Sequence, residues 1–73
     1  MKMQQANIGA SVIEAQYIKR ISTLQLANIL GETRQSVYHL RKQKSAGIHK
    51  VQRLARIFEM PLIDFINLGF KDE

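Results

Sequence analysis

Cysteine and tryptophan are both absent from the 73-residue chain, which also contains only one proline and four glycines. Without cysteine the protein can form no disulfide, has no thiolate nucleophile and cannot bind zinc through sulfur. So few glycines and prolines, with 45% hydrophobic residues, argue against disorder or a collagen-like repeat. No stretch approaches the roughly 20 apolar residues of a membrane span. Residues 1–9 also lack the apolar run of a signal peptide. These absences predict one small folded domain in a reducing, cytoplasmic setting.

Acidic residues are missing from the middle of the chain. Between Thr33 and Phe58 there is no aspartate or glutamate, whereas seven of the eleven lysines and arginines lie there. Clustered positive charge attracts a polyanion more strongly than the formal net charge of +5 indicates by itself. The stretch is typical either of a solvated basic face or of a nucleic-acid-binding surface, and charge alone does not decide between them.

Patterns that indicate catalysis or metal binding are also lacking. The chain has no phosphate-binding loop, no nucleophile beside a base and no pair of carboxylates suited to a cleft. His39 and His49 are ten residues apart with no cysteine or nearby carboxylate, so they lack the spacing of zinc ligands. We therefore expect no enzyme, no metal, no cofactor and no small-molecule ligand.

Helical periodicity runs through the sequence and predicts an all-α fold, because apolar residues recur at three- and four-residue spacings without period-two alternation. The first helix is expected over about residues 7–20 and the second over about residues 23–30. Ser22 and Gln25 form a capping-box pattern before the second helix, and Gly31 suits the left-handed backbone that ends a helix sharply. The apolar stripe expected for the first helix comprises Ile8, Val12, Ala15 and Ile18, widened by Ile13 and Tyr17.

Three further helices follow. Thr33 suits the N-cap of the third helix, whose inward face carries Val37 and Leu40. The fifth helix is expected from Pro61 to about Leu68, because proline cannot continue a helix but fits the first position of a new one. The apolar positions expected for the fourth helix are Ile48, Val51, Leu54, Ala55 and Phe58.

The second and third helices have the spacing of a helix-turn-helix, in which a small residue lies beneath the crossing helix. Ala27 is the small residue, Gly31 follows four positions later, and Val37 follows six positions after that. The whole segment, residues 26–37, resembles the helix-turn-helix of the lambda-repressor-like family, which includes phage repressors and Cro proteins. The resemblance predicts a helix-turn-helix over about residues 23–42.

The resemblance extends beyond this motif to about residues 8–69, because residues 51–58 and 62–66 are similar to the family's fourth and fifth helices. Two residues depart from the family's pattern. Glu32 stands where an apolar residue is common, and Arg20 stands where a helix-ending glycine is frequent. The resemblance implies a compact five-helix, lambda-repressor-like domain.

We expect this single domain to occupy residues 1–73 with short flexible ends at residues 1–6 and 70–73. A helix in the major groove contacts base edges mainly through its N-terminal residues. Arginine pairs well with guanine and glutamine with adenine. The family's base-reading positions match Arg34, Gln35 and His39. The predicted base-reading residues are Thr33, Arg34, Gln35, Tyr38 and His39.

Phosphate contacts are expected on both sides of these residues. Thr23 begins the second helix, where free backbone amides favour an anion. A basic cluster follows the third helix, although any one of its lysines could equally be solvated. The predicted phosphate-contacting residues are Thr23, Ser36, Lys42, Lys44, Ser45 and Lys50.

These observations together predict a sequence-specific, double-stranded-DNA-binding transcriptional regulator similar to a phage or prophage Cro or repressor protein in the bacterial cytoplasm or nucleoid. One recognition helix contacts few bases, so a homodimer on a palindromic operator is expected, formed in solution or only on DNA. The resemblance implies a dimer contact through Phe65, Leu68 and Phe70. Two alternatives stay open. One is a protein-interaction module, antitoxin-like or scaffold, on the same fold, and the other is a non-specific architectural DNA binder.

Overall fold

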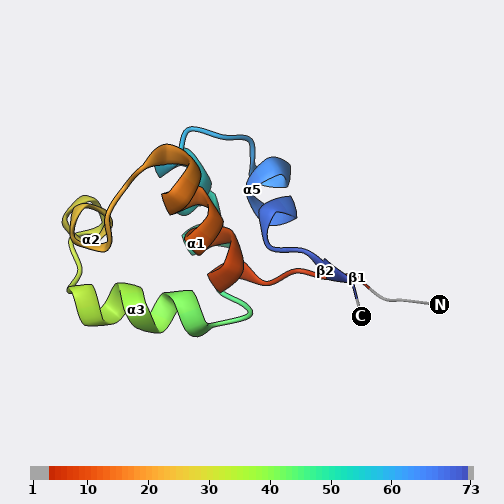
Figure 1. Ribbon diagram of the computed structural model, residues 1–73, viewed down its shortest axis with the longest axis horizontal. Coiled ribbons are helices and arrows are strands. Elements are labelled where there is room, and N and C mark those ends of the chain that lie inside the picture. Colours follow the sequence, from red (N-terminus) through yellow and green to blue (C-terminus); the bar gives the residue numbers. More distant parts are fainter. Residues whose placement is uncertain (1–3, 73) are drawn as a thin grey trace.

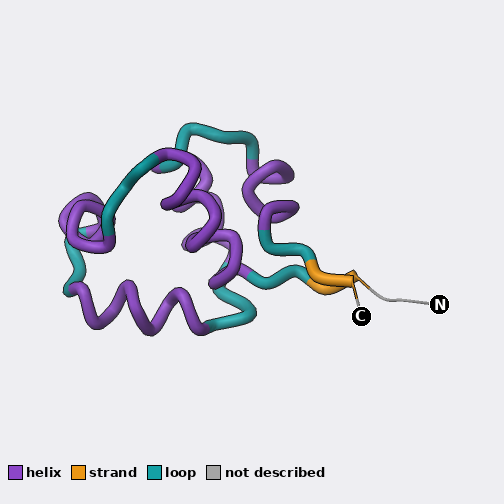
Figure 2. The backbone as a smooth tube through the Cα atoms, in the orientation of Figure 1, coloured by secondary structure: helices purple, strands orange, loops and turns teal. Residues whose placement is uncertain are grey.

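The computed structural model describes residues 4–72, which form five helices joined by short loops (Figure 1, Figure 2). The helices are α1 (Ile8–Lys19), α2 (Thr23–Leu30), α3 (Arg34–Lys42), α4 (Ile48–Ile57) and α5 (Leu62–Leu68). The predicted all-α class is confirmed. None of these helices is long and apolar enough to cross a lipid bilayer.

One feature near the chain ends was not predicted. The two-residue strand β1 (Gln4–Gln5) pairs antiparallel with β2 (Lys71–Asp72), so both ends of the described chain lie on the same side of the molecule (Figure 1). The predicted flexibility of residues 1–6 and 70–73 stays a prediction, and residues 1–3 and 73 lie outside the described part.

Side-chain caps fix the starts of the first three helices. The Asn7 side chain accepts a hydrogen bond from a first-turn amide of α1, and Thr33 does the same for α3. Ser22 and Gln25 form the predicted capping box of α2, with hydrogen bonds of 2.8 and 3.1 Å. Gly31 ends α2 with a left-handed φ of 70°. The predicted bounds of α2 are therefore confirmed.

Two other helix ends have different physical causes. Arg20 ends α1 with a φ of 56°, a left-handed conformation that costs a residue with a side chain about 1–2 kcal/mol. Gly69 ends α5 with a φ of −102°, so no left-handed turn explains the glycine. A Cβ atom at residue 69 would lie only 2.5 Å from the Ser11 hydroxyl oxygen. Gly69 therefore permits the close approach of α5 to α1.

A single hydrophobic core joins the helices. Phe58, which follows α4, and Phe65 of α5 are fully buried and stack with ring centroids 5.9 Å apart. Val37 and Leu40 are buried, which confirms the predicted inward face of α3. Ile48 was predicted to be apolar core at the start of α4, but its side chain is exposed.

The stripe predicted for α1 is wrong in part. Ile13 and Ile18 are exposed, and Tyr17 is 82% exposed. The helix approaches α3 and α5 so closely that small residues, Gly9 and Ser11, occupy its inner face in their place. The buried residues of α1 are Ile8, Gly9, Ser11, Val12, Ala15 and Gln16.

Candidate nucleic-acid interface

Helix α3 lies along one edge of the molecule, with α2 at its N-terminal end and α1 above it (Figure 1). The connection from α2 to α3 is only three residues long, from Gly31 to Thr33. Ala27 is buried in α2, which packs against α3, so the position predicted to need a small residue lies in this packed region. Burial of Val37 and Leu40 fixes which face of α3 points away from the core.

The outward face of α3 carries the side chains predicted to read bases. Arg34, Gln35 and His39 are exposed, and no hydrogen bond or ion pair joins these side chains to another group within residues 4–72. Tyr38 is 51% exposed on the same face. Thr33 is exposed too, but its hydroxyl accepts the Ser36 amide at 3.1 Å and so caps the helix.

One flank of this face is joined to α4 through Glu32. Lys50 forms an ion pair with the Glu32 carboxylate, and the Ser36 hydroxyl donates to it at 2.8 Å. Two hydrogen bonds lower the pKa of Glu32 below its usual value. The bond from Lys50 has the larger effect and the bond from Ser36 the smaller one. Arg53 strengthens the connection by donating to the Leu30 carbonyl at 3.3 Å. Two residues predicted to contact phosphate, Ser36 and Lys50, therefore already contact a carboxylate.

The loop after α3 is held by the first turn of α1. The Ile8 amide donates to the Lys44 carbonyl at 3.0 Å, and the Gly9 amide donates to the Gln43 carbonyl at 2.7 Å. These bonds fix the loop backbone, while the side chains of Lys44 and Ser45 are exposed to solvent. Lys42, the last residue of α3, is exposed as well, so all three residues predicted to contact phosphate at this end of the helix are accessible.

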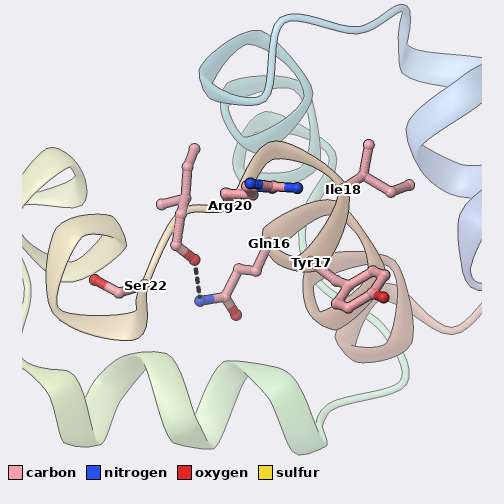
Figure 3. Close-up of a pocket in the computed structure, with 6 residues that line it drawn as sticks. Gln16, Tyr17, Ile18, Arg20 and Ser22 are labelled. Atoms are coloured by element: carbon pink, nitrogen blue, oxygen red, sulfur yellow. Dashed lines mark hydrogen bonds between the residues drawn. The ribbon is translucent and has the colours of Figure 1, made fainter.

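The other flank is a polar cluster contributed by three helices. The hydroxyl of Thr23, at the start of α2, accepts from Nη1 of Arg41 at 3.1 Å and from Nε2 of Gln16 at 3.4 Å. Gln16 Nε2 also donates to the Ile21 carbonyl at 3.2 Å, while the Tyr17 ring points away from it (Figure 3). Thr23 is thus half-buried beside α3, because Gln16 and Arg41 pack against its hydroxyl.

Arg41 was missed by the sequence analysis. Its guanidinium lies 5.7 Å from the centroid of the Tyr38 ring, an i, i+3 arrangement that helical spacing could have indicated. Its bond to Thr23 spans 18 residues, and no local pattern in the sequence signals that contact.

Among known proteins, no family model, no curated protein and no solved structure matches the chain. The side chains around α3 are therefore the basis on which a function is inferred.

The predicted dimer contact needs one correction. Phe65 is fully buried against Phe58, so its ring is not accessible to a partner. Leu68 is partly buried against the core, and Phe70 is 38% exposed. Phe70 is the member of the predicted set with the most accessible side chain.

The two histidines lie apart from any cluster of metal ligands. His39 is exposed on α3 and His49 is exposed in the first turn of α4. Within residues 4–72, no group of three or more His, Cys, Asp or Glu residues could hold a metal ion.

Proposed function

We propose that this chain is a sequence-specific, double-stranded-DNA-binding transcriptional regulator with a lambda-repressor-like fold. In this proposal α2, the three-residue turn and α3 form the helix-turn-helix, and α3 is the recognition helix. One observation carries the proposal. The outward face of α3 presents exposed Arg, Gln and His side chains whose hydrogen-bonding groups have no partner within the described chain.

The position of these side chains suits recognition of bases. Arg34 and Gln35 occupy the first two positions of α3, the end of a recognition helix that meets base edges in the major groove. Arginine forms a bidentate pair with guanine and glutamine forms one with adenine, and each pair contributes about 1–3 kcal/mol of discrimination against a wrong base. His39, one turn further along α3, would reach the next base pairs.

The charges around α3 suit the sugar–phosphate backbone. Lys42 and Lys44 are exposed at the end of α3, and the only acidic residue within the α2–α3 connection, Glu32, is paired with Lys50. A phosphate at the C-terminal end of α3 would therefore meet positive charge, and at the N-terminal end the carboxylate of Glu32 is already paired. Lysines that neutralise phosphates also release counterions, which favours binding at low salt.

A homodimer on a palindromic operator would supply the specificity that one α3 helix lacks. Symmetric binding places the two recognition helices about one helical turn of DNA apart. Leu68 and Phe70 stay candidates for the two-fold contact after the exclusion of Phe65. A dimer bound in this way would repress transcription by blocking polymerase at the operator.

Titration of ¹⁵N-labelled protein with a random-sequence duplex of about 20 base pairs tests this proposal. Amide signals of residues 33–45 should shift at DNA concentrations that leave those of residues 58–60, in the α4–α5 connection, unchanged. The shifts should shrink as salt is raised, because backbone contacts release counterions. Shifts confined to another face, or no shift at low salt, would contradict the proposal.

A further inference from the structure

Arg41 occupies a defined position where three helices meet. Its guanidinium is held on one side by the Thr23 hydroxyl of α2, at 3.1 Å, and lies over the Tyr38 ring of α3 at 5.7 Å. Gln16 of α1 donates to the same hydroxyl at 3.4 Å. These contacts restrict a long side chain that would otherwise lose rotamer entropy when it binds a ligand.

The guanidinium retains most of its hydrogen-bonding capacity. Arginine has five N–H donors, and one of those on Arg41, at Nη1, has an acceptor within residues 4–72. No carboxylate in that part of the chain forms an ion pair with it. Lys50, another cation next to α3, differs in this respect, because it is paired with Glu32.

The surroundings of Arg41 also have an unfilled acceptor. Gln16, Thr23 and Arg41 line one shallow groove beside α3, and Gln16 Oε1 is buried there with no hydrogen-bond partner. The unused groups on Arg41 are all N–H donors, so they suit a ligand that supplies acceptor oxygens. Gln16 Oε1 is itself an acceptor and would not bind such a ligand.

We propose that Arg41 binds a backbone phosphate of the DNA duplex, with Thr23 and Tyr38 as the positioning residues that hold its guanidinium. The inference rests on the proposed function and assigns to it a residue outside the basic cluster at Lys42 and Lys44. A planar guanidinium can form two parallel hydrogen bonds with one phosphate, which a lysine ammonium cannot do. Arg41 would then fix the register of α3 on the side opposite Lys50.

Arg41→Gln and Arg56→Gln form a matched pair for the test. Both remove one positive charge, but Arg56 is exposed in the last turn of α4, beside Met60 and Leu62 and away from α3. Binding to a fluorescent random-sequence duplex is measured by anisotropy from 50 to 200 mM salt. Arg41→Gln should reduce the slope of log K against log salt by about 0.9 and weaken binding about tenfold or more. Arg56→Gln should keep the wild-type slope.

Three further variants test the geometry and cover the case in which Arg41→Gln fails to fold. Arg41→Lys keeps the charge, so it should keep the wild-type slope while its affinity falls severalfold. Thr23→Val removes the hydroxyl that holds Arg41 and should also weaken DNA binding. Thr23→Ser keeps a hydroxyl and should bind DNA as the wild type does. Thermal melts of each variant report loss of folding separately.

The outcomes separate this inference from the proposed function. If wild-type protein binds the duplex with a strong salt dependence and Arg41→Gln has the same slope as Arg56→Gln, Arg41 does not bind phosphate and the inference is overturned. Equal affinities of Arg41→Lys and wild type would overturn the paired hydrogen bonds to phosphate. If the wild-type protein binds no duplex at 50 mM salt, the proposed function fails, and the inference fails with it.

Discussion

Glu32 occupies the turn between α2 and α3, where its carboxylate contacts Lys50 and Ser36. A DNA phosphate would have to replace that carboxylate to bind either residue. Lys44, by contrast, is exposed in the loop after α3, and no carboxylate within residues 4–72 pairs with it. The lysines predicted to contact phosphate should therefore contribute unequally to DNA binding.

Lys44→Ala and Lys50→Ala should differ in the salt dependence of binding to random-sequence DNA. Lys44→Ala should lower the slope of log K against log salt by about 0.9, because one neutralised phosphate is lost. Lys50→Ala should change the slope less, because Glu32 already neutralises that charge. The slopes are measured by titration at several salt concentrations. A larger change for Lys50→Ala would show that DNA displaces Glu32.

Glu32→Gln should alter the acid dependence of stability. Because the pKa of Glu32 is lower in the folded chain than in the unfolded one, its ionised form stabilises the fold above the usual glutamate pKa of about 4.3. That contribution is lost as the pH falls through the folded-state pKa. Both partners are partly exposed, so the gain is at most about 1 kcal/mol.

Thermal melts of wild type and Glu32→Gln from pH 7 to pH 3 measure this contribution. The wild type should melt higher near pH 7, and the difference should shrink below about pH 4.3. A difference in melting temperature that stays constant over the whole range would show that the Glu32 carboxylate does not stabilise the fold.

Helix ends determine how the elements are oriented, and the end of α1 is strained. Arg20→Gly should raise the free energy of unfolding by about 0.5–1 kcal/mol, since the left-handed cost is relieved and partly offset by the greater freedom of unfolded glycine. Glu14→Gly, at an exposed position within α1, should lower it by about 1 kcal/mol. Chemical denaturation measures both. An Arg20→Gly variant no more stable than wild type would contradict the left-handed conformation of residue 20.

Packing of α1 against the end of α3 depends on Gly9. A Cβ atom there would stand 2.6 Å from the Gln43 carbonyl oxygen and closer still to that of Arg41, both of which are backbone atoms. Gly9→Ser should therefore destabilise the domain by about 1–3 kcal/mol or more. Gly47→Ser is the control, because space around Gly47 is open and serine is a good N-cap for α4. Similar melting temperatures for the two variants would rule out the tight packing of α1 on α3.

The elements that the sequence predicted well are those fixed by local chemistry. The capping box at Ser22, the left-handed Gly31 and the N-cap at Thr33 act within four residues, and their positions are confirmed. The inner face of α1 was predicted less well, because Ser11 and Gly9 are buried for reasons that lie in α3 and α5.

In the candidate site, too, features set by local sequence were predicted and contacts between distant residues were not. The exposure of Arg34, Gln35 and His39 followed from helical spacing once Val37 and Leu40 were recognised as the inner face of α3. The pairing of Glu32 with Lys50 joins residues 18 positions apart, and periodicity contains no information about such a contact. The contact between Arg41 and Thr23 also joins residues 18 positions apart, so periodicity could not predict it either.

At the scale of the whole molecule, α3 lies along one edge, while α5 and the β1–β2 pair lie toward the other side (Figure 1). In the proposed dimer, a second copy would bind near Phe70 and both α3 helices would face DNA. A two-fold contact of this kind uses the same surface on both chains, so the bound DNA sequence should itself be symmetric.

Selection of bound duplexes from a random-sequence library tests most directly whether α3 reads base edges. Purified protein is mixed with the library at salt high enough to suppress non-specific binding, and the recovered duplexes are sequenced after several rounds. The proposed function predicts an enriched inverted repeat whose half-sites are about 10 base pairs apart, centre to centre. Recovery of bound duplexes with no sequence enrichment would contradict base recognition by α3.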